Sequence, residues 1–185
     1  MNIIVRPFGS KRHYCRPDTT WERESRDIYI PEGIDEVYWT PIVFIRVCKA
    51  GKCIGKKFAS RYYDAFNFGA LLYMGDGQEY AFTSCADHSS ILPYPLNENA
   101  SLTGSDSYEV HMNGTKIYEY LPNEELTAQL EEALCQASQF TSLRIGDHIA
   151  MELEVRKSIT KREDPTATLE SIWNGKQLFA TKLIF

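Results

Sequence analysis

Residues 42–47 read Ile42-Val43-Phe44-Ile45-Arg46-Val47, a run of β-branched and aromatic residues interrupted by one arginine. A run this apolar is typical of a strand whose two faces are both covered. The turn residues Ala50-Gly51-Lys52 follow it closely. The stretch therefore predicts a central strand buried between two layers, and the rest of the fold is expected to form around it.

Two Asn-Gly pairs, Asn113-Gly114 and Asn174-Gly175, mark β-hairpins further along the chain. Asn and Gly tolerate the positive φ angles that a tight type I′ turn requires. The paired strands are expected at 108–112 with 115–119 and at 169–173 with 177–185. Other strands are expected at 2–6, 27–30 and 148–155. The chain is thus predicted to be mostly β.

Two helices complete the prediction. Residues 124–139 place Leu126, Leu130, Leu134 and Ala137 on one face, with Asn123 positioned to cap the first turn. Residues 56–66 show a weaker helical spacing of apolar side chains. The polar stretches at 9–28, 75–107 and 157–167 are expected to be mostly loop.

Bulk composition limits the function. The chain has 185 residues, which suits a single domain over 1–185. Its net charge of -5 argues against nucleic acid, whose binding relies on Lys and Arg. The basic residues at 52–61 are interpreted as a solvated helix face. With no apolar run of membrane-spanning length and five widely spaced cysteines, we expect no membrane partner and a cytoplasmic, reducing location.

No local motif predicts a catalytic or metal site. Cys85 and His88 have the Cys-x2-His spacing of a zinc-binding pair, but no second pair accompanies them. Ser84, Asp87, His88 and Ser89 are the residue types of a catalytic triad, yet neighbours in one loop rarely face each other as a triad must. No glycine pattern for phosphate binding is present.

Several segments together resemble the fumarylacetoacetate hydrolase family. Arg16-Pro17-Asp18-Thr19, followed by residues 28–31, is similar to the family's Lys-Pro-x-Thr/Ser sequence and its Ile-Pro strand end. Similar segments elsewhere in register are the strand and turn at 43–52, residues 59–64 with Gly69, Gly146-Asp147, and residues 174–184. The resemblance implies a mostly β, α+β domain with two helices. It would be a mixed β-sandwich or β-roll of the family's C-terminal-domain type, trimmed at the N-terminus.

The resemblance also implies a lost active site. The family hydrolyses or decarboxylates 1,3-dicarbonyl and acylpyruvate-type acids with a divalent cation, usually Mg²⁺. Its Glu-x-Glu and later Asp ligands fall on Thr40, Ile42 and Leu71, and its lysine falls near Ser84. The set of former-pocket positions is Trp39, Thr40, Ile42, Leu71, Ser84, Asp87 and Ser89. The family's Thr-Gly-Thr-Pro falls on residues 151–154, and the segment that carries its His-x-x-Glu is missing between Val5 and Tyr14.

Hard cations need oxygen ligands, which Ile42 and Leu71 do not offer. We therefore expect no metal, no other cofactor and no catalytic residue, and we expect Trp39, Ile42 and Leu71 to pack as core. The leading hypothesis is a non-catalytic family member that acts as a binding module or partner subunit. It would form a homodimer or pair with an intact family homologue. Two alternatives are a hydrolase or lyase on small 1,3-dicarbonyl acids with a repurposed pocket, and a structural homodimer.

Overall fold

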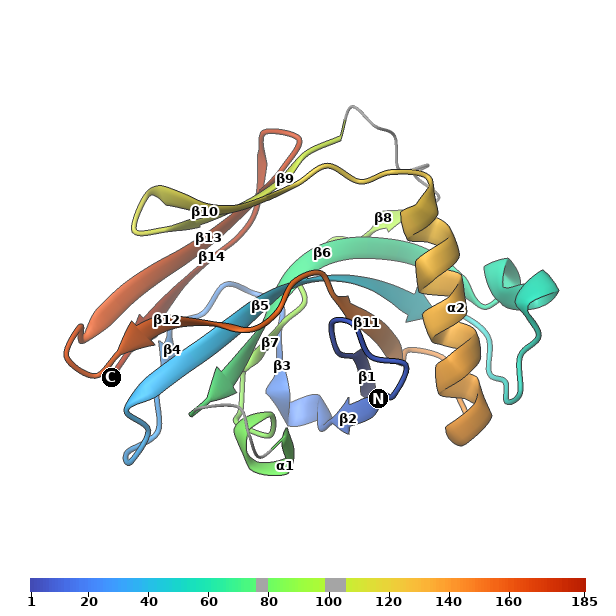
Figure 1. Cartoon of the computed structure of the whole chain (residues 1–185), viewed down its shortest axis with the longest axis horizontal. Helices are drawn as coiled ribbons and strands as arrows, with labels where there is room; N and C mark the ends of the chain where they lie inside the picture. Colours follow the sequence, from blue (N-terminus) through green and yellow to red (C-terminus); the bar gives the residue numbers. More distant parts are fainter. Residues whose placement is uncertain (76–79, 99–105) are drawn as a thin grey trace.

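Two β-sheets and one long helix make up the molecule (Figure 1). The computed structural model describes residues 1–75, 80–98 and 106–185. The strands of the larger sheet are β1 (Ile3–Arg6), β2 (Tyr14–Arg16), β3 (Trp21–Glu22), β5 (Glu36–Val47), β6 (Tyr63–Met74), β7 (Ser90–Ile91), β8 (Asn97–Glu98), β11 (His148–Glu152) and β12 (Lys157–Lys161). The smaller sheet contains β4 (Ile28–Tyr29), β9 (Tyr108–Met112), β10 (Thr115–Tyr120), β13 (Thr166–Trp173) and β14 (Lys176–Ile184). The helices are η1 (Asp18–Thr20), η2 (Lys56–Arg61), α1 (Tyr80–Thr83) and α2 (Glu125–Phe140), of which η1 and η2 are 3-10 helices.

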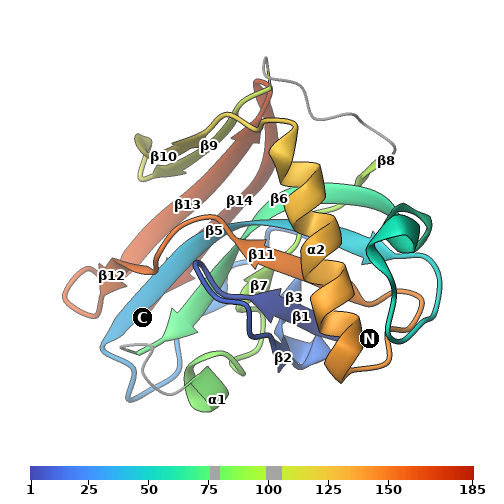
Figure 2. The same ribbon diagram turned by 45° about the vertical axis from the view of Figure 1, so that its right-hand side comes forward.

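The larger sheet curls into a roll. Its strands follow the order β2-β1-β11-β5-β6-β7-β3, with β12 beside β5 and β8 beside β6. The strands at the two ends, β2 and β3, are consecutive in sequence and are joined only through Pro17 and η1. A sheet whose two ends are connected by so short a segment must bend back on itself, and Figure 2 shows β1, β2 and β3 lying across from β5 and β6.

One buried arginine holds the two ends of the roll together. The Arg16 side chain, 1% exposed, starts on β2 and reaches across to β6 and β7. Its Nη2 donates to the carbonyl oxygen of Leu72 at 2.8 Å, and its Nη1 donates to the carbonyl oxygen of Ser89 and the hydroxyl of Ser90, both at 3.0 Å. Its Nε donates to the Tyr14 hydroxyl at 3.4 Å. A buried guanidinium is stable only when its donors are satisfied, so these bonds fix the distance across the roll.

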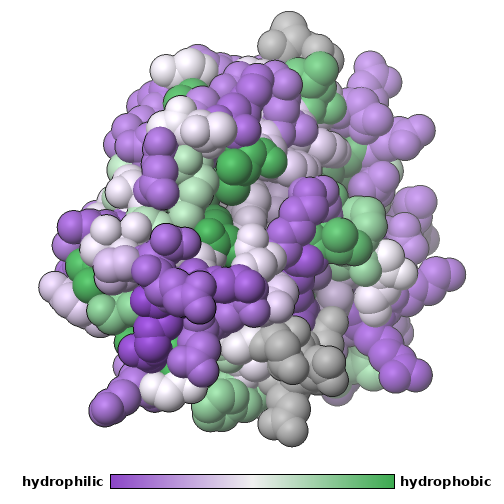
Figure 3. Space-filling model, turned by 60° about the vertical axis from the view of Figure 1, so that its left-hand side comes forward, coloured by the Kyte–Doolittle hydropathy of each residue, from purple (hydrophilic) through white to green (hydrophobic). Residues whose placement is uncertain are grey.

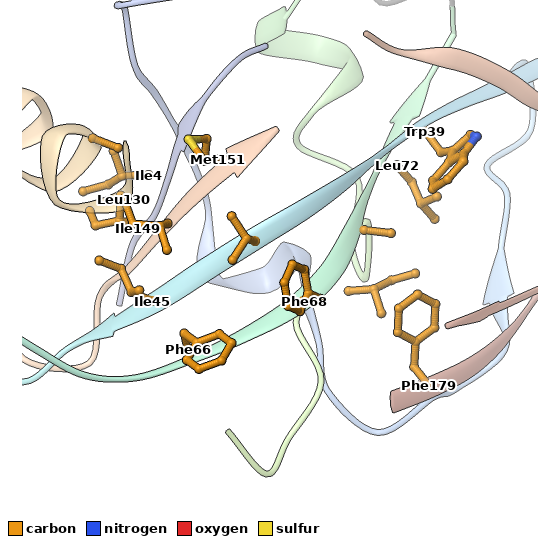
Figure 4. Close-up of a cluster of buried hydrophobic side chains, with 14 of the residues drawn as sticks. Ile4, Trp39, Ile45, Phe66, Phe68, Leu72, Leu130, Ile149, Met151 and Phe179 are labelled. Carbon is orange, nitrogen blue, oxygen red and sulfur yellow. The ribbon is translucent and has the colours of Figure 1, made fainter. Parts of the chain in front are cut away.

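The outer face of the roll is covered by α2 and by the smaller sheet, and together they form the main core. In Figure 4, Ile45, Phe66 and Phe68 point from β5 and β6 toward Leu130 of α2 and Phe179 of β14. The Phe68 ring stacks on Tyr108 of β9 with centroids 4.6 Å apart. Alternate residues of β5 and β6 therefore face opposite layers, which explains why the sequence of these strands is apolar throughout.

Most elements predicted from the sequence are present. Both Asn-Gly hairpins are confirmed, with Asn113 and Asn174 each at a φ of 50°. The long helix is confirmed at Glu125–Phe140, and the Asn123 Oδ1 accepts the Glu125 N–H at 3.1 Å near its start. The central strand is confirmed and is longer than predicted, covering Glu36–Val47.

Two predictions are wrong in detail. A helix over 56–66 does not form, because only Lys56–Arg61 are helical and the chain then enters β6. Pairing with β5 overrides the weak helical spacing, and Phe66 lies opposite Ile45. The charged stretch from residue 157 is not a loop, since Lys157–Lys161 form β12 against the start of β5. Its charges are those of an edge strand that faces solvent.

The surface carries scattered apolar residues. On the face in Figure 3, hydrophobic residues lie as separate spots among hydrophilic ones, which is normal for a protein surface. The basic residues at 52–61 are exposed, in agreement with a solvated face, although they lie on and before η2 and not on an α-helix. None of the helices in the described ranges has the length and apolar character needed to cross a membrane.

Replacement of Arg16 by Met should destabilise the protein strongly. The substitution would remove the charge-assisted hydrogen bonds to the carbonyl oxygens of Leu72 and Ser89 and to the Ser90 hydroxyl, at a cost of about 3 kcal/mol or more in the free energy of unfolding. Urea unfolding followed by circular dichroism measures the change. The exposed Arg12→Met variant is the control and should change stability by less than about 0.5 kcal/mol. Equal stability of both variants would contradict a closing role for Arg16.

Candidate functional site

The inside of the roll holds its own hydrophobic cluster, which we call the roll core. It consists of Ile3, Val5, Ile42, Phe44, Leu71, Tyr73, Leu92 and Ala150, with Tyr14, Trp21, Tyr38 and Leu96 packed against it. These side chains come from β1, β2, β3, β5, β6, β11 and the residues just after β7. The middle of the roll is therefore filled by side chains, and polar groups gather toward its two ends.

A buried carboxylate lies at the first end. Glu152 is the last residue of β11, is 4% exposed, and lies opposite Ile42 in the pairing with β5. Its Oε1 accepts a hydrogen bond from the Tyr73 hydroxyl and forms an ion pair with Arg156 Nη2 at 3.2 Å. Its Oε2 accepts the backbone N–H of Phe8 at 2.9 Å. Both oxygens are thus engaged, and the carboxylate is held by a guanidinium, a phenol and a backbone amide.

The groups around this carboxylate form one network. The guanidinium carbons of Arg156 and Arg16 lie 3.6 Å and 4.5 Å from the centroid of the Tyr73 ring. The Tyr14 and Tyr73 hydroxyls are hydrogen-bonded to each other. Burial raises the pKa of Tyr73 well above its usual value and also raises the pKa of Tyr14, so both phenols stay protonated at neutral pH. The network has two cations for one carboxylate, and cation–π contact with Tyr73 helps to stabilise them.

A buried histidine occupies the second end. His148, the first residue of β11, is 1% exposed and packs against Trp21 and Phe44 with ring centroids 5.4 Å and 5.6 Å away. Its Nε2 is 3.1 Å from the Tyr94 hydroxyl, and its Nδ1 has no protein partner. Burial lowers the pKa of His148 to about 4, with the nearby Arg46 as a further cause. The ring is therefore neutral at pH 7.

A small hollow lies on the outside near this second end, lined by Trp21, Glu22, Arg23, Glu24, Arg26 and His88. The His88 Nδ1 is 2.9 Å from the Glu22 Oε2, and the Glu22 side chain is 3% exposed while that of His88 is 46% exposed. A solvent-reached imidazole oriented by a buried carboxylate is an arrangement found in catalytic and binding sites.

The structure brings three of the seven expected pocket positions together. Thr40 lies opposite Leu71 in the pairing of β5 with β6, and Ile42 is two residues further along the same face. All three are fully buried, and the Thr40 hydroxyl donates to the carbonyl oxygen of Glu154 at 2.7 Å. Trp39 does not share this face, because successive strand residues alternate. Its ring lies in the main core, edge-on to Tyr118 at 6.4 Å.

The other three positions lie between α1 and β7 and are spread over different environments. Ser84 and Ser89 are buried, and the Ser89 Oγ accepts from Arg16 Nη1 at 3.2 Å. Asp87 is exposed. The polar residues that do converge inside the roll were missed by the sequence analysis: Tyr14, Arg16, Tyr73, Glu152 and Arg156. Alternation along β11 offered one usable signal, since it puts His148, Ala150 and Glu152 on the same face.

These residues do not fit a hard divalent cation. Mg²⁺ needs several oxygen ligands, usually with carboxylates among them. At the expected position, Ile42 and Leu71 supply no oxygen, and the Thr40 hydroxyl is already bound to a backbone carbonyl. Glu152, which lies opposite Ile42 in the strand pairing, forms an ion pair with Arg156. Across residues 1–75, 80–98 and 106–185, no three His, Cys, Asp or Glu side chains converge closely enough to hold a metal ion.

Comparison of sequences finds no match: no protein-family model and no curated protein resembles the chain closely enough. Solved structures do match over almost its whole length. The fumarylpyruvate hydrolase of Pseudomonas aeruginosa, in complex with Mn²⁺ and pyruvate, has a TM-score of 0.82 at 12% identity, covering 100% of this chain and 90% of that one. The 2-hydroxyhepta-2,4-diene-1,7-dioate isomerase of Mycobacterium marinum has a TM-score of 0.81 at 13% identity, covering 99% and 74%.

A third similar structure comes from a protein that is assigned to a family. A Yersinia pestis CO92 protein assigned to the fumarylacetoacetate hydrolase family has a TM-score of 0.77 at 14% identity, covering 99% of this chain and 92% of that one. The protein is thus a mostly β roll with a second sheet packed on it. Its fold is that of the fumarylacetoacetate hydrolase family, as the sequence resemblance implied. Identities this low establish the shared fold and leave the chemistry to be argued from the side chains.

Leu71→Asp should destabilise the protein by roughly 2–4 kcal/mol, because it places an unpaired charge in the roll core. Chemical unfolding of the purified variant measures the loss. Leu121→Asp is a matched control, since Leu121 is 61% exposed and should tolerate the charge. An unchanged melting temperature for Leu71→Asp would mean that this part of the roll is open to water.

His148 should make stability depend on pH. Its pKa is about 4 in the folded protein against 6.5 ordinarily, so the unfolded state binds its proton first as the pH falls. Stability is therefore lost between about pH 6.5 and 4, and His148 accounts for about 2 kcal/mol of the loss between pH 7 and 5. In His148→Asn, the difference in unfolding free energy between pH 7 and 5 should shrink by that amount. Phe44→Leu disturbs the same packing without removing a titratable group. Its difference in unfolding free energy between pH 7 and 5 should equal that of the wild type. An undiminished difference in His148→Asn would show that the ring is not held neutral.

Proposed function

We propose that this protein is a non-catalytic member of the fumarylacetoacetate hydrolase family that acts as a binding module or a partner subunit. One observation carries the proposal: the position expected for the cation's carboxylate ligands holds Thr40, Ile42 and Leu71, all fully buried. The shared fold supports the family assignment. The lack of carboxylate ligands for a cation at these positions argues against the metal-dependent chemistry of that family.

The electrostatics of the roll support the same proposal. A cation in such a site absorbs negative charge as a carbon–carbon bond breaks. Here the positive charge beside Glu152 comes from Arg156, which is tied to the protein by an ion pair and by contact with Tyr73. A guanidinium fixed in this way offers no exchangeable coordination position for a substrate oxygen. It stabilises the fold and leaves no room for the substrate chelation that the family reaction needs.

A second candidate function is an enzyme with a repurposed pocket, a hydrolase or lyase on small 1,3-dicarbonyl or acylpyruvate-type acids. The observation in its favour is the His88–Glu22 pair beside the surface hollow. A neutral imidazole whose Nδ1–H is held by a carboxylate presents its Nε2 as a proton acceptor. Such a site would work without a metal, so an assay must not assume metal dependence.

Association with another subunit is a further part of the proposal. Closed two-fold assemblies are the commonest oligomers, and the chain is rich in Tyr and Phe, which interfaces favour. We expect a homodimer or a complex with an intact homologue, in a reducing, cytoplasmic setting where the five free cysteines stay reduced. Light scattering of the purified protein at micromolar concentration should give about twice the monomer mass of 21.2 kDa. A monomer would contradict the homodimer.

Metal content and turnover test the main proposal together. The purified protein, equilibrated with excess Mg²⁺ or Mn²⁺ and desalted, should carry far less than one metal ion per chain by elemental analysis. It should also show no turnover of acylpyruvates or oxaloacetate above background, with or without the metals. The reason is that each lost 1.36 kcal/mol of transition-state stabilisation costs a factor of ten, and a lost electrostatic element can cost a hundredfold or more.

Controls make both results interpretable. The Pseudomonas aeruginosa fumarylpyruvate hydrolase, whose structure holds Mn²⁺, serves as the positive control for metal retention. Stoichiometric, tightly held metal in this protein would overturn the proposal. Turnover that is lost in His88→Ala or Asp87→Ala but is independent of metal would establish the second candidate instead.

A further inference from the structure

The hollow at the second end of the roll has the features of a binding site for a small ligand. Its volume is about 130 Å³, and its wall is formed by β3 and residues that follow it, together with His88. Pockets for drug-sized ligands measure about 300–1,000 Å³, so this hollow admits only a molecule of a few heavy atoms. Trp21 of its wall packs against His148, with ring centroids 5.4 Å apart.

Buried interactions hold His88 in place at the rim. Its backbone adopts a left-handed φ of 59°, and its N–H donates to the carbonyl oxygen of Thr19 at 3.2 Å. Non-glycine residues adopt this conformation only when the surroundings impose it. The Glu22 carboxylate uses Oε2 for His88 and Oε1 for the Glu24 N–H at 2.7 Å, so it is fully engaged and fixes the imidazole. His88 is therefore a fixed part of the rim of the hollow.

Two guanidinium groups face the same hollow. Arg23 lies over the Trp21 ring, with its guanidinium carbon 5.4 Å from the centroid. Arg23 and Arg26 share a single carboxylate, Glu24, through Arg23 Nε at 3.4 Å and Arg26 Nη2. Each guanidinium carries five N–H donors, so most of them are available to a ligand. The available groups are mainly donors, which suits an oxyanion and disfavours a cation.

The charge of the wall selects among oxyanions. Arg23 and Arg26 contribute two positive charges, and Glu22 and Glu24 contribute two negative ones. A wall with no net charge accepts a monoanion more readily than a doubly charged phosphate. We infer that this hollow binds a small carboxylate anion, held by the guanidinium groups of Arg23 and Arg26. The inference supplies a ligand class for the binding module proposed above and rests on that proposal.

Nuclear magnetic resonance of the full chain tests the inference. The protein has three tryptophans, Trp21, Trp39 and Trp173, and each gives one indole N–H signal. Acetate or pyruvate, added at constant ionic strength against NaCl, should shift the Trp21 signal saturably in the millimolar range and leave the Trp39 signal, from the main core, in place. Acetamide, which has the shape of acetate without its charge, should cause no saturable shift. Inorganic phosphate should bind more weakly than acetate.

Variants identify the groups that hold the anion. Arg23→Gln and Arg26→Gln should each weaken binding at least fivefold, since a hydrogen bond to a charged group is worth at least that factor. Arg162→Gln, which removes an exposed arginine paired with Asp35, is the matched control and should bind as the wild type does. The Trp39 and Trp173 signals report whether each variant is folded. The inference would be overturned if the Trp21 shift grew linearly with anion concentration or if NaCl caused the same shift. An unchanged affinity in the two hollow variants would also overturn it. That outcome would leave the metal and turnover results untouched, so the partner-subunit role could still stand.

Discussion

The hydrogen bonds of Arg16 are the constraint on which the rest of the structure depends. A curled sheet has two edges, and edges are unstable unless they are paired or covered. Here β2 and β3 form the two ends, and the guanidinium of Arg16 spans the gap to Leu72, Ser89 and Ser90. Because the group is buried and charged, it tolerates little movement of its acceptors. The diameter of the roll, and with it the space available inside, follows from this interaction.

A buried positive charge shapes the chemistry of the interior. With Arg16 fixed in the roll, Arg156 adds a second cation, and Glu152 is the carboxylate that offsets them. The phenols of Tyr14 and Tyr73 lie between these groups and stay protonated because burial disfavours their ionised forms. The interior is therefore an internally compensated network. A network of this kind is costly to disrupt, and it resists the water and exchangeable ligands that a metal-dependent site requires.

The same fold in hydrolases and isomerases does not transfer their activity. The fumarylpyruvate hydrolase and the isomerase share the fold of this chain at 12% and 13% identity, and the side chains inside the roll decide what each protein can do. On the outside of the roll, the buried carboxylate of Glu22 orients the exposed imidazole of His88. Interaction with other molecules is therefore expected at this surface and not in the filled interior.

The sequence by itself determined the local elements and the fold class. The apolar run at 42–47, the two Asn-Gly turns and the leucine stripe of α2 each depend on neighbouring residues, and such patterns survive without tertiary context. The residue types at Thr40, Ile42 and Leu71 also led to the expectation that no cation binds there. Only the tertiary structure decided which polar groups meet. Glu152 with Phe8, Arg16 with Ser89, and His88 with Glu22 are each separated by at least 66 positions, and no local periodicity links such pairs. The same limit explains β6, where pairing with β5 turned a weak helical pattern into a strand, and Trp39, whose side chain faces the main core because strand residues alternate.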